Sequence, residues 1–119
     1  MPMPLAIKRV YDPAAKADGT RILVDRLWPR GVSKEKAAID RWERDLSPSD
    51  ELRKEFNHEP ERFEAFRAGF LAELEEQSER LGTIAAEARA GQVTLVYAAR
   101  EERYNNAVVI AEAIAGVKA

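Results

Sequence analysis

The sequence predicts an α/β fold: a single compact domain with a small, mostly parallel central sheet and helices on both faces. Apolar, β-branched runs near both ends of the chain predict strands, and helix signals dominate the segment between them. The run Ile22–Val24 is continuous rather than alternating, as expected of a strand covered on both faces. The 119 residues of the chain suffice for one domain with a core and are too few for two.

The first half of the chain predicts three strands and one short helix. We expect the first strand in LAIKRVY (5–11) and the second in RILVDRLW (21–28), where a Pro–Gly breaker follows. Weak alternation in DRWERDL (40–46) predicts the third strand. Between the second and third strands, Ser33 is the expected N-cap of a short helix.

Helix signals begin at Ser47. This serine is the expected N-cap, with Pro48 at the first helical position, of a helix that ends near Phe56. Pro60 should start the next helix. That helix carries an apolar stripe at helical spacing: Phe63, Phe66, Phe70, Leu74 and Leu81.

The last part of the chain predicts a helix, a strand and a final helix. Gly82 is expected to interrupt the long helix, and Thr83 to cap a shorter one that ends at Gly91. The segment VTLVYAA (93–99) is the clearest strand of the sequence, being short, apolar and β-branched. The final helix should begin near the Tyr-Asn-Asn triplet and cover 104–116.

The segment DRLWPRG, which follows the second strand, has an unusual mixture of residues. Arg26 and Arg30 offer planar, bidentate donors for phosphate or carboxylate, and Trp28 could form a pocket wall. Asp25 could orient an arginine. The alternative is an internal ion-pair network in which Asp25 pairs with Arg9 or Arg26 while Trp28 is core, and the two interpretations are compatible.

A second candidate segment follows the last strand. Arg100 could close over an anion placed at the first amides of the final helix, which are unsatisfied. One asparagine of the pair Asn105 and Asn106 is expected to be the N-cap, which leaves the other to face the cleft. Tyr97 ends the strand either as a catalytic or hydrogen-bonding group or as a core aromatic. If the two strands are parallel neighbours, both segments lie at one edge of the sheet.

Composition and charge exclude several classes of function. With one histidine and no cysteine, we expect no metal site, no thiol chemistry and no cofactor. The net charge of −2 and the pI of about 5.5 argue against nucleic-acid binding. No apolar run approaches the roughly 20 residues of a membrane span, so we expect a cytoplasmic protein without a membrane partner. Residues 1–4 are expected to be flexible.

Three stretches taken together resemble one known family. They are VDRLWPRG, the DLSPS-containing run that follows it, and VTLVYAAREERYNNAVVI. The chain is similar over nearly its whole length, from about Ile7 to Ile114, to the short branch of the DUF488 family. The family name denotes a domain of unknown function. The resemblance therefore implies a fold and a location for the site, and it supplies no established activity.

The resemblance also shows where this chain departs from longer members. Those members place a cysteine where Tyr97 stands, and a Cys-His-Arg triplet at Asn105, Asn106 and Ala107. This chain differs at all four positions. Thiol, metal or redox chemistry suspected for those relatives is therefore not carried over.

The leading hypothesis is a small cytoplasmic protein that binds a phosphate- or carboxylate-bearing ligand at the carboxyl ends of the strands. The candidate ligand-binding residues are Arg26, Trp28, Arg30, Tyr97, Arg100, Asn105 and Asn106, with Arg9 and Asp25 in support. Whether the protein is an enzyme stays open, and Tyr97 or His58 would be the first groups to test for proton transfer. The alternatives are a module that recognises an acidic protein segment or a nucleic-acid end, and a polar cluster that only ties strands together.

Overall fold

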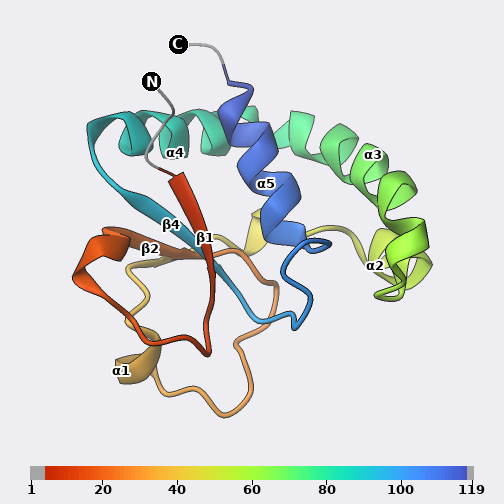
Figure 1. Ribbon diagram of the computed structural model, residues 1–119. Helices are drawn as coiled ribbons and strands as arrows, with labels where there is room; N and C mark the ends of the chain where they lie inside the picture. The colour runs from red at the N-terminus through yellow and green to blue at the C-terminus, as the bar shows by residue number, and fades with distance from the viewer. Residues whose placement is uncertain (1–4, 118–119) are drawn as a thin grey trace.

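The computed structural model describes residues 5–117 and centres on a four-stranded sheet (Figure 1). Across the sheet the strands are β1 (Leu5–Arg9), β4 (Val93–Tyr97), β2 (Thr20–Leu23) and β3 (Arg41–Trp42). All three neighbouring pairs run parallel, which confirms the predicted α/β class. The expected flexibility of residues 1–4 lies outside the described part of the chain.

Helices cover the two faces of the sheet unequally. The main core lies on the face covered by α3 (Phe63–Leu74), α4 (Ser78–Ala90) and α5 (Asn106–Ala115). In Figure 1, α4 lies above the strands, α3 lies to their upper right, and α5 lies between these two helices. The other face carries a smaller cluster that includes Leu23, Val96 and Ala37 of the one-turn helix α1 (Lys34–Ala37). Loop side chains complete that second cover.

The remaining elements connect the sheet to the helical layer. Helix α2 (Asp50–Phe56) packs against α3 as a helical hairpin. Short 3₁₀ turns occupy Lys16–Asp18, Arg44–Leu46, Pro60–Arg62 and Glu75–Gln77. The crossover from β3 to β4 therefore contains α2, α3 and α4, and this arrangement brings α2 to the carboxyl edge of the sheet.

Several predicted boundaries were wrong. The three early strands are shorter than predicted, and β2 ends at Leu23 because the chain turns away after Val24 donates to the carbonyl of Val96 at 3.1 Å. The cap of α2 is Ser49, whose hydroxyl accepts from the amide of Leu52, rather than Ser47. The Ser47 hydroxyl instead donates to the carbonyl of Arg44 at 2.7 Å.

The predicted interruption at Gly82 was also wrong. Helix α4 runs through this glycine, and the Thr83 hydroxyl donates to the carbonyl of Glu79 at 3.0 Å instead of capping a new helix. A glycine inside a helix costs only about 1 kcal/mol relative to alanine, which packing of the buried face offsets. Leu81 therefore belongs to α4, and the predicted stripe is divided between two helices.

Candidate functional site

The two polar segments meet because β2 and β4 are neighbours. Their parallel register places Leu23 beside Val96, so the loops 25–33 and 98–105 leave the same edge of the sheet. The Asp25 carboxylate accepts the backbone N–H of Ala98 at 2.9 Å, which joins the two loops directly. The predicted proximity of the two segments is confirmed.

A pocket of about 350 Å³ lies between these loops and the α2–α3 hairpin. Six of the nine residues proposed from the sequence line it: Asp25, Arg26, Trp28, Arg30, Asn105 and Asn106. The hairpin adds lining residues that sequence reasoning did not place in the site: Arg53, Phe56 and Phe66. His58, named from the sequence as a group to test for proton transfer, and Tyr104 also line the pocket.

Asp25 is the half-buried carboxylate of the pocket. One oxygen accepts from the Ala98 amide and the other from Asn106 Nδ2 at 3.0 Å. The expected pairing with Arg9 or Arg26 does not occur, because the side chain turns toward the start of α5. Burial raises the pKa of Asp25 above its ordinary value, and the hydrogen bonds from Asn106 and Ala98 offset only part of that rise.

The two asparagines divide their roles as predicted. Asn105 is the N-cap of α5 and accepts from the amide of Val108 at 3.0 Å. Its Nδ2 donates to the carbonyl of Glu101 at 2.8 Å, so this buried side chain is fully engaged. Asn106 is free of the capping role and lies in the pocket, where it contacts Asp25.

Three exposed arginines line the mouth of the pocket. Arg26 pairs with Asp50, and Arg53 reaches the same carboxylate at 3.3 Å. Both pairs are about half exposed to solvent, where ion pairs typically contribute only about 0–1 kcal/mol. The side chain of Arg30 is exposed, and its carbonyl accepts from the Tyr11 hydroxyl at 3.1 Å. An incoming anion can therefore compete for these guanidinium groups at little cost.

Trp28 is held by contacts with two residues that do not line the pocket, Val32 and Trp42. Its Nε1 donates to the carbonyl of Val32 at 2.7 Å, and its ring meets that of Trp42 edge-on at 5.5 Å. Trp42 Nε1 in turn donates to the carbonyl of Asp25 at 2.7 Å. These bonds fix the loop that carries Arg26, and they explain why tryptophan stands beside charged residues here.

Three predicted residues do not line the pocket. Tyr97 is 2% exposed and belongs to the main core, where burial raises the pKa of its phenol. Arg100 is exposed on the loop outside the pocket. Arg9 does not line the pocket but contacts a residue that does. Its Nε donates to the carbonyl of Ala99 at 2.9 Å, which connects β1 to the loop 98–105.

His58 reaches the pocket through an unusual backbone. Asn57, the C-cap of α2, and His58 both have left-handed conformations, with φ of 46° and 55°. Such a conformation is uncommon for residues other than glycine, although asparagine, aspartate and histidine adopt it several-fold more often than the rest. It turns the chain back after α2, and the imidazole lies 6.1 Å from the ring of Phe56. The histidine is thus a wall residue at the exposed edge.

Comparisons with known proteins show which family the chain belongs to. A family model described as "Inactive DUF488-N3 subclade" matches residues 4–117. The chain belongs to the DUF488 family. It is 44% identical over 110 residues to "Uncharacterized protein YeaO" of Escherichia coli (strain K12). The aligned residues cover 92% of this chain and 96% of that protein. "Uncharacterized protein Rv3073c" of Mycobacterium tuberculosis (strain ATCC 25618 / H37Rv) is 36% identical, with 92% of each chain covered. No solved structure matches.

The resemblance implies departures from longer members at four positions of this DUF488 protein, and these positions have different roles in the structure. Tyr97 and Ala107 are core residues, Asn105 is the buried cap of α5 and touches the pocket, and Asn106 lies in the pocket without a capping role. The described residues contain no group of three or more His, Cys, Asp or Glu placed to hold a metal ion. Across residues 5–117, no helix is long and apolar enough to cross a membrane.

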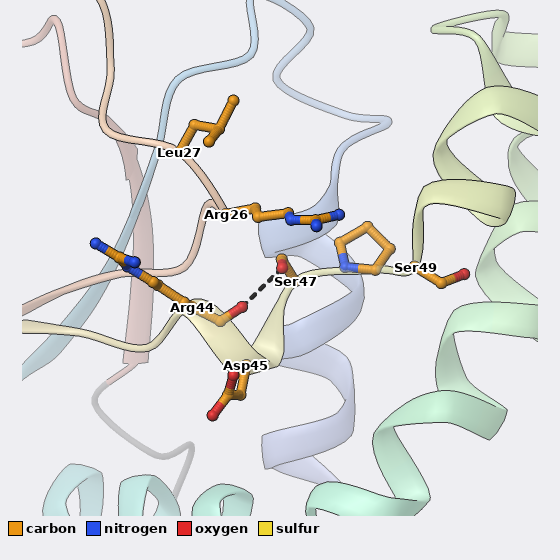
Figure 2. Close-up of a pocket in the computed structure, with 7 residues that line it drawn as sticks. Arg26, Leu27, Arg44, Asp45, Ser47 and Ser49 are labelled. Carbon is orange, nitrogen blue, oxygen red and sulfur yellow. Dashed lines mark hydrogen bonds between the residues drawn. The ribbon is translucent and has the colours of Figure 1, made fainter.

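A second, open groove of about 460 Å³ adjoins the pocket (Figure 2). The two hollows share Arg26, Leu27, Ser47 and Pro48, and Leu27 between them is 69% exposed. In Figure 2 the side chains of Arg26 and Arg44 point in opposite directions. The guanidinium of Arg44 lies over the ring of Trp42, 3.8 Å from its centroid. The two cationic residues of the groove, Arg26 and Arg44, therefore do not converge on a shared point.

Proposed function

We propose that this DUF488 protein is a cytoplasmic binding protein for a small ligand that bears phosphate or carboxylate. The observation that carries the proposal is that Arg26 and Arg30 of one loop and Arg53 of α2 line one concave pocket. Guanidinium groups bind planar, bidentate anions with charge-assisted hydrogen bonds. Small secreted domains commonly depend on disulfides, and the absence of cysteine supports the cytoplasmic location.

The composition of the wall supports binding of a molecule larger than an inorganic ion. Phe56 and Phe66 are buried, and Trp28 and Tyr104 are half-buried. Ligand pockets commonly combine such apolar walls with a few polar groups that fix orientation. The ligand would place its apolar part against these rings and its anionic group at the exposed arginines.

Two features favour binding without catalysis. The matched family model is described as an inactive subclade. Tyr97, one of the two groups to test first for proton transfer, lies in the core with a raised pKa and does not line the pocket. The other group, His58, is exposed and lines the pocket, so it is the residue at which a catalytic role would be tested.

The test is a titration of the isotope-labelled protein with inorganic phosphate and with citrate, followed by amide chemical shifts. We expect the shifts to concentrate in loops 25–33 and 98–106. Arg53→Ala should weaken binding about fivefold, as expected for loss of one partly exposed charge-assisted contact. Arg100→Ala is the matched control, because this arginine is exposed and lies outside the pocket. Equal weakening by both variants would count against the proposed pocket.

The second candidate function is an interaction module for an acidic protein segment or a nucleic-acid end. The exposed Leu27 between the two adjoining hollows favours it, since an extended partner could occupy both. Binding of this kind should involve the Arg44 side of the groove and, for nucleic acid, weaken steeply as salt rises. An acidic peptide or oligonucleotide that shifts only residues of the pocket would argue for the small ligand instead.

A further inference from the structure

The pocket contains a carboxylate as well as arginines, and the two charges lie at different depths. Asp25 is half-buried beside the start of α5, whereas Arg26, Arg30 and Arg53 are exposed at the mouth. Among residues 5–117, Asp25 forms no ion pair, and its described partners are one backbone amide and the Asn106 side chain. A compact anion placed deep in the pocket would therefore meet a negative group.

Asp25 also has unused hydrogen-bonding capacity. An ionised carboxylate offers about four acceptor positions. The protein supplies two hydrogen bonds, from Ala98 N–H to one oxygen and from Asn106 Nδ2 to the other. Each oxygen can therefore accept one more donor from the pocket. Two adjacent N–H groups on one ligand edge match this pattern.

The wall around Asp25 favours a planar head group. Trp28 and Tyr104 are half-buried aromatic residues of the lining, and Phe56 and Phe66 are buried residues of the same lining. Aromatic side chains pack favourably against flat rings. The volume of about 350 Å³ is within the range of pockets that hold small organic ligands.

We propose that the ligand is a phosphate-bearing compound whose planar head carries adjacent N–H donors, as guanine does, with the head at Asp25 and the phosphate at the arginines. The inference rests on the proposed function and adds the head group to it. Among nucleobases, adenine and uracil present a donor beside an acceptor on the same edge, and that acceptor would face the lone pairs of Asp25. A guanine-type edge avoids this repulsion.

The experiment is calorimetric titration of the full chain with guanosine 5′-monophosphate, adenosine 5′-monophosphate and ribose 5-phosphate. We expect the guanine nucleotide to bind about tenfold more tightly than the other two, the factor expected for one well-paired hydrogen-bonding edge. Asp25→Asn should remove this preference while retaining binding of ribose 5-phosphate. Asp12→Asn, which changes an exposed carboxylate outside the pocket, is the matched control and should retain the preference.

The possible failures are distinguishable. Equal affinities for the three compounds, or preference for the adenine nucleotide, would overturn the head-group inference and leave the anion pocket standing. Absence of binding by all three and by inorganic phosphate would overturn both proposals. If Asp25→Asn does not fold, the wild-type protein still decides: the amide resonance of Ala98 should shift with the guanine nucleotide and stay in place with ribose 5-phosphate. The same shift with both ligands would contradict a head group at Asp25.

Discussion

The N-termini of α2 and α5 lie near the same pocket, but the carboxylates beside them come from different parts of the chain. Helix α2 has Asp50 and Glu51 in its own first turn, and the N–H of its cap Ser49 donates to the carboxylate of Glu73 at 3.0 Å. Helix α5 has no acidic residue in its first turn. Its neighbouring carboxylate is Asp25, which is 81 residues away from Asn106 in sequence.

The acids at the start of α2 belong to that helix itself, whereas the carboxylate at the start of α5 is brought there by the tertiary fold. Acids in the first turn of an exposed helix interact favourably with the helix dipole regardless of the rest of the fold. The carboxylate at α5 reaches that position only because β2 and β4 are adjacent. The same adjacency creates the pocket, so the stability of the α5 end and the shape of the site depend on one contact between loops.

Among the variants that test this comparison, Asp25→Ala is expected to change the free energy of unfolding most. The substitution leaves the Ala98 amide and the Asn106 side chain without their acceptor, and it should lower the free energy of unfolding by about 2 kcal/mol. Asp50→Ala removes an exposed acid of the first turn together with its exposed ion pairs to Arg26 and Arg53, and it should cost only about 0.5 kcal/mol. Urea unfolding followed by circular dichroism measures both values. Equal losses would show that the two helix ends are maintained in the same way.

A somewhat smaller contrast is expected between the two caps. Asn105→Ala removes a side chain that is 2% exposed and that both accepts from Val108 and donates to Glu101, so we expect a loss of about 2 kcal/mol. Ser49→Ala removes one partly buried acceptor and should cost about 1 kcal/mol. Thermal unfolding of both variants provides the measurement. A larger loss of stability from Ser49→Ala than from Asn105→Ala would contradict the inference that α5 depends more strongly on its cap than α2 does.

The pH dependence of stability should have opposite signs at two carboxylates. Burial raises the pKa of Asp25, so its contribution to stability is fully present below its ordinary pKa of 3.8 and is lost as pH rises through the raised value. Hydrogen bonds from Arg41 lower the pKa of Glu87, so its contribution is present above its ordinary pKa of 4.5 and is lost as pH falls.

Unfolding free energies of the wild type, Asp25→Asn and Glu87→Gln across this pH range test the prediction. The advantage of the wild type over Asp25→Asn should shrink as pH rises, and its advantage over Glu87→Gln should grow. Parallel curves for the two variants would contradict the assigned environment of Asp25.

The smallest effect is expected from Asp50→Asn. Removing this charge frees Arg26 and Arg53 from their shared partner and should tighten binding of inorganic phosphate about twofold, within the range of an exposed ion pair. Calorimetry gives the affinity, and Glu51→Gln is the matched control in the same helical turn. Weaker binding in Asp50→Asn would mean that the aspartate positions the arginines rather than competing for them.

Sequence reasoning performed best where one local pattern determined the structure. The apolar run of β4, the polar loop and a cap at one of the two asparagines were predicted together, because a short β-branched strand and an asparagine before an apolar helix each have one common structural interpretation. Which asparagine forms the cap was left open, and the structure assigns it to Asn105. The neighbouring position of β2 and β4 was stated as a condition, and the structure fulfils it.

The rest depended on tertiary placement, which local patterns do not contain. Arg53 lies on an exposed helix face, where charged residues are ordinarily solvated, and only the packing of α2 beside the loops brings it to the pocket. Tyr97 was placed in the site because it ends a strand, but the alternation of side chains along β4 directs it into the core. Local patterns also lack the tertiary contacts that set the cap of α2 at Ser49 and continue α4 through Gly82. The cap predicted at Ser47 and the break predicted at Gly82 were wrong for this reason.

The contact between Trp28 and Trp42 has a practical consequence. These are the two tryptophans of the chain, and they meet edge-on at 5.5 Å beside the loop that carries Asp25. The intrinsic tryptophan fluorescence of the protein therefore originates in one region, and one of the two tryptophans, Trp28, lines the pocket. Occupancy of the pocket can be followed optically in the unmodified protein, without a dye or an isotope label.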